Sequence, residues 1–287
     1  KDAKKIIFYD LAFHKTIILN CGNPILYPLL EFINHILELN FRANQNEQKN
    51  YFIGWEKKYL TQHEDLKNFI LKIKDGQIDG ANITVPFKME IINYLDELRP
   101  EAEKTQSVNT VSFENNKAVG HNTDISGFIR AIKDIKLQIE GKKILILGAG
   151  GVVPSIIYAL NEMKASEIIV SNRTKQNAIN LKNFFNYLTI VDWGKVPEFD
   201  IIINATSLGL KNSDVIDIDF SQTEKGKVFY DLIYNPSETN FLKKARLLGN
   251  KTENGKRMFI HQAAQAFKIW NKIEPKINNE VNKLLDQ

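Results

Sequence analysis

A continuous apolar strand runs directly into a glycine-rich turn in the segment Lys142-Lys143-Ile144-Leu145-Ile146-Leu147-Gly148-Ala149-Gly150-Gly151. The residues from about 152 to 164 have the spacing of a helix, and residues 167–171 have the composition of the next strand. A strand, a glycine turn, a helix and a second strand form the βαβ unit of a nucleotide-binding domain. The segment therefore predicts a parallel sheet of Rossmann type.

Strand and helix patterns alternate along the rest of the chain, which favours an α/β protein with a mostly parallel sheet. Before the glycine turn we expect a helix over 64–73, a strand over 80–84, a helix over 88–98 and a hairpin around Glu114-Asn115-Asn116. After it we expect strands over 199–204 and 228–233 and helices over 259–270 and 276–285.

A polar stretch with helical character, residues 134–141, is the predicted boundary between two domains. It separates an N-terminal α/β substrate domain (1–135) from a Rossmann-type dinucleotide domain (136–257). The C-terminal helices (258–287) are expected to return and pack on the first domain.

The composition excludes several classes of protein. The net charge of +4 comes from scattered lysines, which is typical of a solvated surface and argues against a nucleic-acid partner. No apolar run reaches the roughly 18–20 residues that a membrane-spanning helix needs. Cys21 is the only cysteine, so an internal disulfide and a multi-cysteine metal site are excluded. We expect a cytoplasmic monomer or homodimer that needs no metal and acts on a small molecule.

The turn Gly148-Ala149-Gly150-Gly151 is the candidate phosphate-binding site. The first glycine permits a tight turn, and the next glycine of the pattern, Gly150, lets the backbone approach a pyrophosphate. The following helix offers free N–H groups and a partial positive charge. The third position of the fingerprint is Val153 in place of glycine or alanine, so helix and strand are expected to pack less closely. The alternative is a strand–turn–helix that binds no ligand.

The end of the next strand predicts which dinucleotide binds. An NAD site would place an acid there, to accept a hydrogen bond from the ribose 2′-hydroxyl. This chain has Asn172-Arg173-Thr174-Lys175 instead. Arg173 and Lys175 offer positive charge to a 2′-phosphate, which predicts NADP in place of NAD. The alternative is an ordinary surface arginine.

Lys88 and Asp124 are the candidate proton-transfer pair. Burial near a helix N-terminus disfavours the ammonium form of a lysine, whereas a neighbouring carboxylate favours it, so the two groups can hold one proton between them. A single lysine rarely has such a role. Here Asn82, Thr84 and Asn109 are also expected near strand ends, and such uncharged polar groups suit a polyhydroxylated ligand.

An ordered set of motifs resembles the shikimate dehydrogenase family. Each motif alone is weak evidence, and their order from about Gly80 to Trp270 is the specific signal. The matching segments are 82–88, 108–110, 120–124 with Gly127-Phe128, 148–151, 172–174, 204–207 with Gly209, 230–232 with Tyr234, Pro236 and Thr239, and Met258 with 262–264 and Phe267.

The resemblance implies NADP-linked interconversion of 3-dehydroshikimate and shikimate, with Lys88 and Asp124 transferring the proton. It implies four residues that bind the ring hydroxyls and one, Tyr234, near the substrate carboxylate; the four are Asn82, Thr84, Asn109 and Gln262. Besides the glycine turn, the implied cofactor residues are Asn172, Arg173, Thr174, Lys175, Thr206, Ser207, Leu232, Gly255 and Met258.

The N-terminal segment departs from the family pattern. The family has Gly-Asn-Pro-Ile and then a His-Ser-x-Ser-Pro loop, whose two serine hydroxyls bind the substrate carboxylate. This chain has Gly22-Asn23-Pro24-Ile25-Leu26-Tyr27-Pro28. If Pro28 is the family proline, Tyr27 occupies the place of the second serine and no residue replaces the first. Losing one charge-assisted hydrogen bond costs about 1.5–3 kcal/mol.

Three functions therefore stay open on the sequence. The chain is a divergent shikimate dehydrogenase in which Tyr27 helps to bind the carboxylate, a paralogue acting on quinate or a related cyclic hydroxy acid, or a non-catalytic dinucleotide-binding homologue. The intact Lys88 and Asp124 argue against the third, because a binding module needs no proton shuttle. Arg173 argues mildly against a quinate enzyme that prefers NAD.

Overall fold

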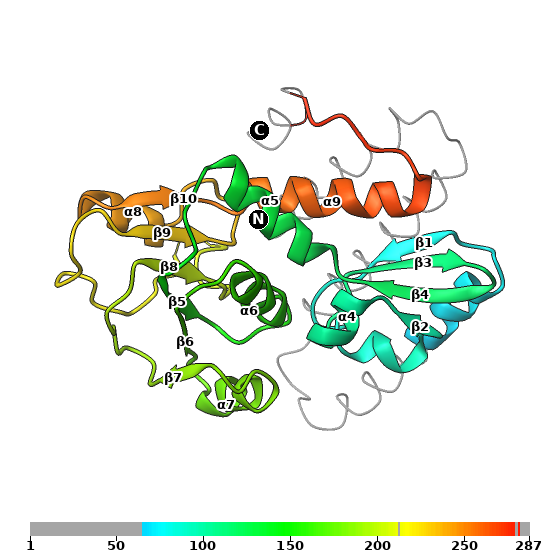
Figure 1. Ribbon diagram of the computed structural model, residues 1–287, viewed down its shortest axis with the longest axis horizontal. Coiled ribbons are helices and arrows are strands. Elements are labelled where there is room, and N and C mark those ends of the chain that lie inside the picture. The colour runs from blue at the N-terminus through cyan, green and yellow to red at the C-terminus, as the bar shows by residue number, and fades with distance from the viewer. Residues whose placement is uncertain (1–64, 212, 279–280, 282–287) are drawn as a thin grey trace. The chain divides into compact units, whose positions relative to one another are not determined.

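The computed structural model describes residues 65–211, 213–278 and 281. Of these, residues 65–79, 278 and 281 belong to one compact unit, and Gly80–Ile277 form a second (Figure 1). In the first unit residues 65–74 are helical and bury Ile70 and Ile73, which confirms the described part of the helix predicted over 64–73. Tyr27 and most of the helix predicted over 276–285 lie outside the described residues. Residues 276–278, which are described, are not helical.

A four-stranded sheet, ordered β1-β3-β4-β2, begins the second unit. β1 (Gly80–Asn82) and β3 (Thr110–Glu114) are antiparallel, β3 and β4 (Lys117–His121) form a hairpin, and β2 (Glu97–Leu98) is parallel to β4. Asn115 and Asn116 have φ values of 50° and 62°, which asparagine tolerates in a tight hairpin turn. The predicted hairpin is confirmed, although this sheet is mixed and not parallel.

The single helix predicted over 88–98 is wrong. Lys88 lies in a turn, a short 3₁₀ helix (η1) covers only Glu90–Tyr94, and β2 takes the end of the segment. Pairing with β4 explains the difference. Asp96 N donates to Ala118 O at 3.0 Å, and Ala118 N donates to Asp96 Oδ2 at 2.9 Å. These bonds join residues 22 positions apart and override the local helical spacing.

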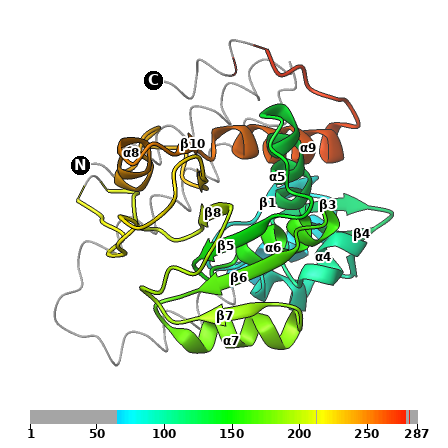
Figure 2. The same ribbon diagram turned by 60° about the vertical axis from the view of Figure 1, so that its left-hand side comes forward.

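A six-stranded sheet in which all strands are parallel follows, in the order β10-β9-β8-β5-β6-β7. Figure 2 shows its central strands, with β5 between β8 and β6. The predicted Rossmann-type sheet is confirmed, whereas its two edge strands were not predicted. The strands are β5 (Lys143–Leu147), β6 (Glu167–Ser171), β7 (Thr189–Val191), β8 (Ile201–Asn204), β9 (Val228–Asp231) and β10 (Lys251–Glu253).

The central strand β5 is buried on both faces. Ile144 and Ile146 belong to one hydrophobic core, while Leu145 and Leu147 belong to another. Successive side chains of a strand point to opposite faces, so a strand covered on both sides reads as an unbroken apolar run. The helices of this half are α6 (Val153–Glu162), α7 (Lys175–Phe184) and α8 (Asn240–Leu247).

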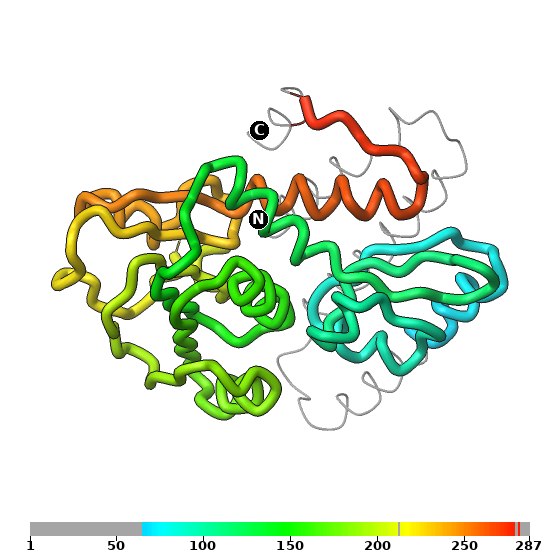
Figure 3. Tube along the Cα trace, viewed as in Figure 1, coloured from blue at the N-terminus to red at the C-terminus, as the bar shows by residue number. Residues whose placement is uncertain are grey.

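Two further helices lie against each other, as the green and orange tubes of Figure 3 show. They are α5 (Thr123–Asp134) and α9 (Lys256–Asn271). A side chain at Gly127 would come within 2.9 Å of Gln262, so glycine there allows the close approach. At the other end of α9, Trp270 Nε1 donates to Val111 O of β3 at 2.9 Å.

The predicted linker 134–141 is not helical beyond Asp134, where α5 ends. Lys136 has a φ of 53°, in the left-handed region that stops a helix. The domain boundaries near 135 and 257 stay predictions. None of the described helices has the length and apolar character that crossing a membrane requires.

Candidate functional site

Lys88 and Asp124 form a buried ion pair. Lys88 lies in the turn between β1 and η1, and Asp124 lies in the first turn of α5. Lys88 Nζ is 2.6 Å from Asp124 Oδ2, and the two side chains are only 11% and 7% exposed. The Asn122 side chain caps this helix by accepting a hydrogen bond from Asp124 N at 3.1 Å. The structure thus brings the two predicted proton-transfer residues together.

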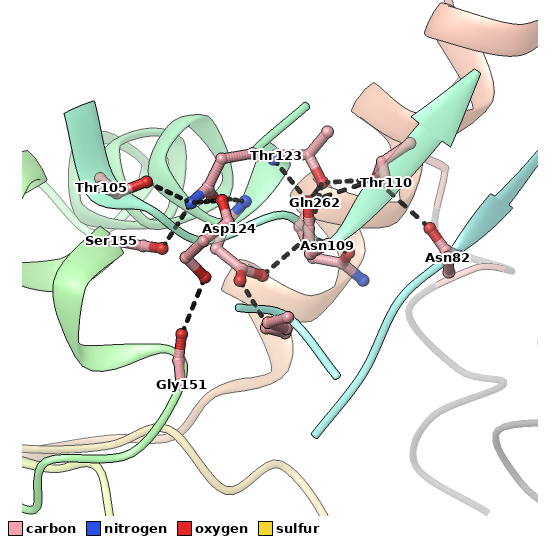
Figure 4. A network of polar contacts seen from close by, with 12 residues as sticks. Asn82, Thr105, Asn109, Thr110, Thr123, Asp124, Gly151, Ser155 and Gln262 are labelled. Carbon is pink, nitrogen blue, oxygen red and sulfur yellow. Dashed lines mark hydrogen bonds and ion pairs between the residues drawn. The ribbon is translucent and has the colours of Figure 1, made fainter. Parts of the chain in front are cut away.

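Asn109 fixes the other oxygen of the carboxylate (Figure 4). Its Nδ2 donates to Asp124 Oδ1 at 3.0 Å, and its Oδ1 accepts from Thr123 N at 2.7 Å. The same Nδ2 lies 3.4 Å from Gln262 Oε1, on α9. Both oxygens of Asp124 therefore have hydrogen-bond donors, and a fixed orientation of the carboxylate follows.

Two further predicted substrate residues, Asn82 and Tyr234, are connected to this network. Asn82 and Thr84 are exposed, and Asn82 Oδ1 accepts a weak bond from Thr110 Oγ1 at 3.4 Å. The Tyr234 ring stacks on Phe259, with their centroids 4.2 Å apart. Phe259 O in turn accepts a bond from Gln262 Nε2 at 3.0 Å. Tyr234 is therefore connected to the network through α9.

The glycine turn lies between β5 and α6. Gly148 has a φ of +113°, and a side chain there would come within 2.8 Å of Ala205 O, so only glycine suits this position. A Cβ added at Gly150 would meet nothing within 4 Å among the described residues, which leaves room for a ligand beside the backbone. A Cβ on Gly151 would lie 3.8 Å from the Lys88 side chain. The turn therefore fits a dinucleotide and lies beside Lys88, a member of the candidate proton-transfer pair.

Val153, at the third fingerprint position, is fully buried in the core of this half. Its burial shows that the valine side chain is accommodated between α6 and the sheet, while the looser packing stays a prediction. Pro154 follows it in the first turn of α6, where a missing N–H costs no helical hydrogen bond.

The loop after β6 carries two cations in different settings. Arg173 is exposed and has no ion pair among the described residues. Lys175 Nζ is 2.7 Å from Asp192 Oδ1, and this contact lowers the pKa of the Asp192 carboxyl. Asn172 Nδ2 donates to Thr174 O at 2.8 Å and shapes the loop. Of these two cations, the guanidinium of Arg173 is the one that has no matching acid in the described part of the chain.

A buried carboxylate, Asp231, joins the loops after β8 and β9. Its Oδ1 accepts from Asn204 Nδ2 at 3.0 Å, and its Oδ2 accepts from Thr239 Oγ1 at 2.6 Å. Asn204 Oδ1 in turn accepts from Thr206 N at 3.0 Å, which places the exposed Ser207 next in the loop. Ile233 N also donates to Oδ1 at 3.0 Å. Burial raises the pKa of Asp231 to about 6, because these three donors do not fully replace water.

The other predicted cofactor residues meet where β9 ends and α9 begins. Gly255 N donates to Ile233 O at 3.1 Å, and a side chain at Gly255 would collide with Leu232 O. Met258 is buried in the first turn of α9. Leu232, Gly255 and Met258 are thus neighbours, as their proposed common role requires.

Sequence reasoning missed two buried serines beside the site. Ser107 Oγ donates to Gly151 O at 3.0 Å, and Ser155 Oγ accepts from Asn122 Nδ2 at 2.8 Å. Asn122 carries a local signal, because an asparagine directly before a helix predicts a cap. Ser107 and Ser155 carry none, since their partners lie 44 and 33 positions away.

Comparison with known proteins identifies two matching family models. Residues 42–111 match the shikimate dehydrogenase substrate binding domain, and residues 130–236 match shikimate / quinate 5-dehydrogenase. Shikimate dehydrogenase (NADP(+)) of Pelagibacter ubique (strain HTCC1062) is 46% identical over 272 residues, which covers 95% of this chain and 99% of the relative. The chain belongs to the shikimate dehydrogenase family.

Solved structures of the shikimate dehydrogenase family and its neighbours share the fold. Shikimate 5-dehydrogenase from Thermus thermophilus, in complex with NADP(H) and shikimate, has a TM-score of 0.70 at 31% identity and covers 78% of this chain and 84% of its own. The ligand-free 5-ketofructose reductase of Gluconobacter sp. strain CHM43 has a TM-score of 0.69 at 30% identity, covering 78% and 83%. These likenesses confirm the predicted two-domain α/β fold with a Rossmann-type domain.

Proposed function

We propose that this chain interconverts 3-dehydroshikimate and shikimate, with NADP as its redox cofactor. One observation carries the proposal: the buried pair of Lys88 and Asp124 lies at 2.6 Å within a network of uncharged polar side chains. The glycine turn adjoins it, because a Cβ on Gly151 would lie 3.8 Å from the Lys88 side chain. A proton shuttle beside a dinucleotide turn is what alcohol–ketone exchange requires.

The protein's own residues handle the proton. NADP, when bound, supplies the nicotinamide that accepts or returns a hydride. In the oxidation direction the pair of Lys88 and Asp124 takes the hydroxyl proton as the carbinol C–H bond breaks, and in reduction it returns that proton to the new alkoxide. Asn109 Nδ2 donates to Asp124 Oδ1 at 3.0 Å and fixes the carboxylate. The carboxylate in turn keeps Lys88 Nζ in one position.

Uncharged donors and acceptors around the pair suit a ring with several hydroxyls. Asn82, Thr84, Asn109 and Gln262 are proposed to bind these hydroxyls, because amides and hydroxyls both donate and accept. Tyr234 and Tyr27 are proposed to bind the substrate carboxylate, and Tyr27 lies outside the described residues. The proposed domains are a substrate domain over 1–135, a cofactor domain over 136–257 and C-terminal helices over 258–287 that pack on the first domain. Tyr234 and Met258 are the two proposed site residues that do not follow this division.

The chain's residues fit NADP at the sites that sequence reasoning proposed. The turn Gly148-Ala149-Gly150-Gly151 is proposed to hold the pyrophosphate, and Arg173 to bind the 2′-phosphate. Support comes from the open space beside Gly150 and from the exposed guanidinium. The proposed supporting residues are Asn172, Thr174, Lys175, Thr206, Ser207, Leu232, Gly255 and Met258.

A second candidate is a related cyclic hydroxy acid or keto-alcohol as substrate. The observation that favours it is the segment Gly22–Pro28, which lacks the serine pair of the family pattern. A protein named 5-ketofructose reductase has the same fold as this chain, with a TM-score of 0.69.

Turnover by the purified chain separates these candidates. The chain is incubated with NADP or NAD and with shikimate, quinate or a neutral polyol, and cofactor reduction is followed by absorbance. We expect NADP reduction with shikimate and much slower reaction with quinate. Turnover of quinate or the polyol without turnover of shikimate would establish the second candidate. Tight NADPH binding with no turnover of any alcohol would establish a binding protein.

A further inference from the structure

We propose that Ser107 and Ser155 are positioning residues that set the distance between the proton-transfer pair and the cofactor turn. This inference rests on the proposed function. The two serines and Asn122 form a buried polar cluster between the first sheet and α6. We name these three residues the junction. Figure 4 labels Ser155 of this junction together with Asp124 and Gly151.

One short segment, 107–109, contacts the glycine turn and both members of the proton-transfer pair. Ser107 Oγ donates to Gly151 O of the glycine turn at 3.0 Å. Val108 N donates to Lys88 O at 2.8 Å, and Asn109 Nδ2 donates to Asp124 Oδ1 at 3.0 Å. The segment therefore ties the turn, the lysine and the carboxylate to one stretch of backbone.

Asn122 makes a second connection. Its Oδ1 accepts from Asp124 N at 3.1 Å, while its Nδ2 donates to Ser155 Oγ at 2.8 Å and to Ser107 O at 2.9 Å. One amide thus links the first turn of α5 to the first turn of α6. Ser107 and Ser155 have no exposed surface, and Asn122 is 6% exposed.

Burial makes these bonds geometrically demanding. Apolar surfaces can slide past one another at little cost, whereas a buried donor or acceptor that loses its partner costs about 1–3 kcal/mol. The junction therefore favours one register between α5 and α6. Hydride transfer depends on that register, because a misplacement of about 1 Å can cost roughly 100-fold in rate.

Alanine variants of the serines test the proposal. Ser107→Ala, Ser155→Ala and the double variant are compared with Ser112→Ala, which removes a buried hydroxyl of β3 that bonds to Glu114 at 2.7 Å, away from the turn. We measure kcat for shikimate oxidation and NADPH affinity by fluorescence. We also measure the kinetic isotope effect on 3-dehydroshikimate reduction, using NADPH that carries deuterium at the position of the transferred hydride. Hydrogen exchange over 122–128, 150–156 and 251–253 is measured without ligand.

In the double variant we expect kcat to fall by about 10- to 100-fold, with a larger isotope effect and unchanged NADPH affinity. Exchange should quicken in 122–128 and 150–156 together and stay unchanged in 251–253. Ser112→Ala should keep the wild-type kcat and isotope effect. If the double variant does not fold, Ser155→Ala alone is expected to raise the isotope effect.

Two results would overturn the inference. One is an unchanged isotope effect and unchanged exchange in Ser155→Ala and the double variant. The other is a loss of NADPH affinity as large as the loss of kcat, which would mean that the serines shape the cofactor site only. Failure of the proposed function is distinct, because wild-type protein would then not oxidise shikimate. The exchange data would still decide whether the junction couples the two segments.

Discussion

Arg173 has an exposed guanidinium at the carboxyl end of β6, whereas the charge of Lys175 is matched by Asp192 at 2.7 Å. We therefore expect the preference for NADP to depend mainly on Arg173. Arg173→Ala should raise KM for NADP by about tenfold or more, because one charge-assisted hydrogen bond contributes about 1.5–3 kcal/mol. Initial rates with NADP and with NAD measure the effect.

The matched control is Lys175→Ala, which should change KM for NADP much less because its partner already neutralises it. KM for NAD should stay the same in both variants, since NAD has no 2′-phosphate. An equal loss for the two cofactors in Arg173→Ala would assign the arginine to adenine stacking and contradict the phosphate role.

The residues that were predictable are those whose chemistry follows from a short segment. Gly148 was predicted because a glycine between a strand and a helix implies an unusual backbone, and its φ of +113° agrees. Lys88 and Asp124 were proposed as a pair, and their 2.6 Å contact agrees. Ser155 was not predictable, because a serine inside a helix becomes informative only when its partner across space, Asn122, is known.

At the scale of elements, Asp231 links the ends of β8, β9 and the start of α8. Burial raises the pKa of its carboxyl to about 6 in the folded state, from an ordinary value of 3.8. The folded protein therefore holds this proton more tightly than the unfolded chain does. Its contribution to stability is most favourable below pH 3.8 and is lost as the pH rises through about 6.

Asp231→Asn should remove this pH dependence. The free energy of unfolding of the wild type minus that of the variant should fall by about 2–3 kcal/mol between pH 4 and pH 7, since one pKa unit corresponds to 1.36 kcal/mol. Urea unfolding at several pH values measures it. Asp219→Asn is the control. Hydrogen bonds from the backbone and side chain of Ser221 lower the pKa of the exposed Asp219, so the same difference in unfolding free energy should not fall as the pH rises. A difference that is constant or rises with pH for Asp231→Asn would contradict the account.

Elements were predictable where local pattern and tertiary environment agree. β5 and β6 were predicted because each contains an unbroken apolar run, Ile144–Leu147 and Ile168–Val170, which is typical of a covered parallel strand. β2 was missed because Glu97–Leu98 is too short to show a period, and pairing with Val119 and Gly120 creates the strand. β10 was missed for the same reason, since its three residues are a strand only beside β9.

At the scale of the whole second unit, a parallel sheet presents the glycine turn and a mixed sheet presents the lysine. The two parts meet in the polar network that contains Asp124, Asn122 and Gly151. The α/β class was predictable from the alternation of strand and helix patterns. The contacts that bring the two sheets together were not, because they join side chains far apart in the sequence.

The most direct test of the account compares shikimate turnover by the wild type and by Lys88→Ala, with NADPH affinity measured on both. We expect kcat to fall by about 100-fold or more, since general acid–base catalysis contributes about 10²–10⁴-fold. NADPH affinity should be kept, and the surface variant Lys117→Ala should behave as the wild type. Wild-type turnover in a folded Lys88→Ala would contradict the assignment of proton transfer to this lysine and its carboxylate.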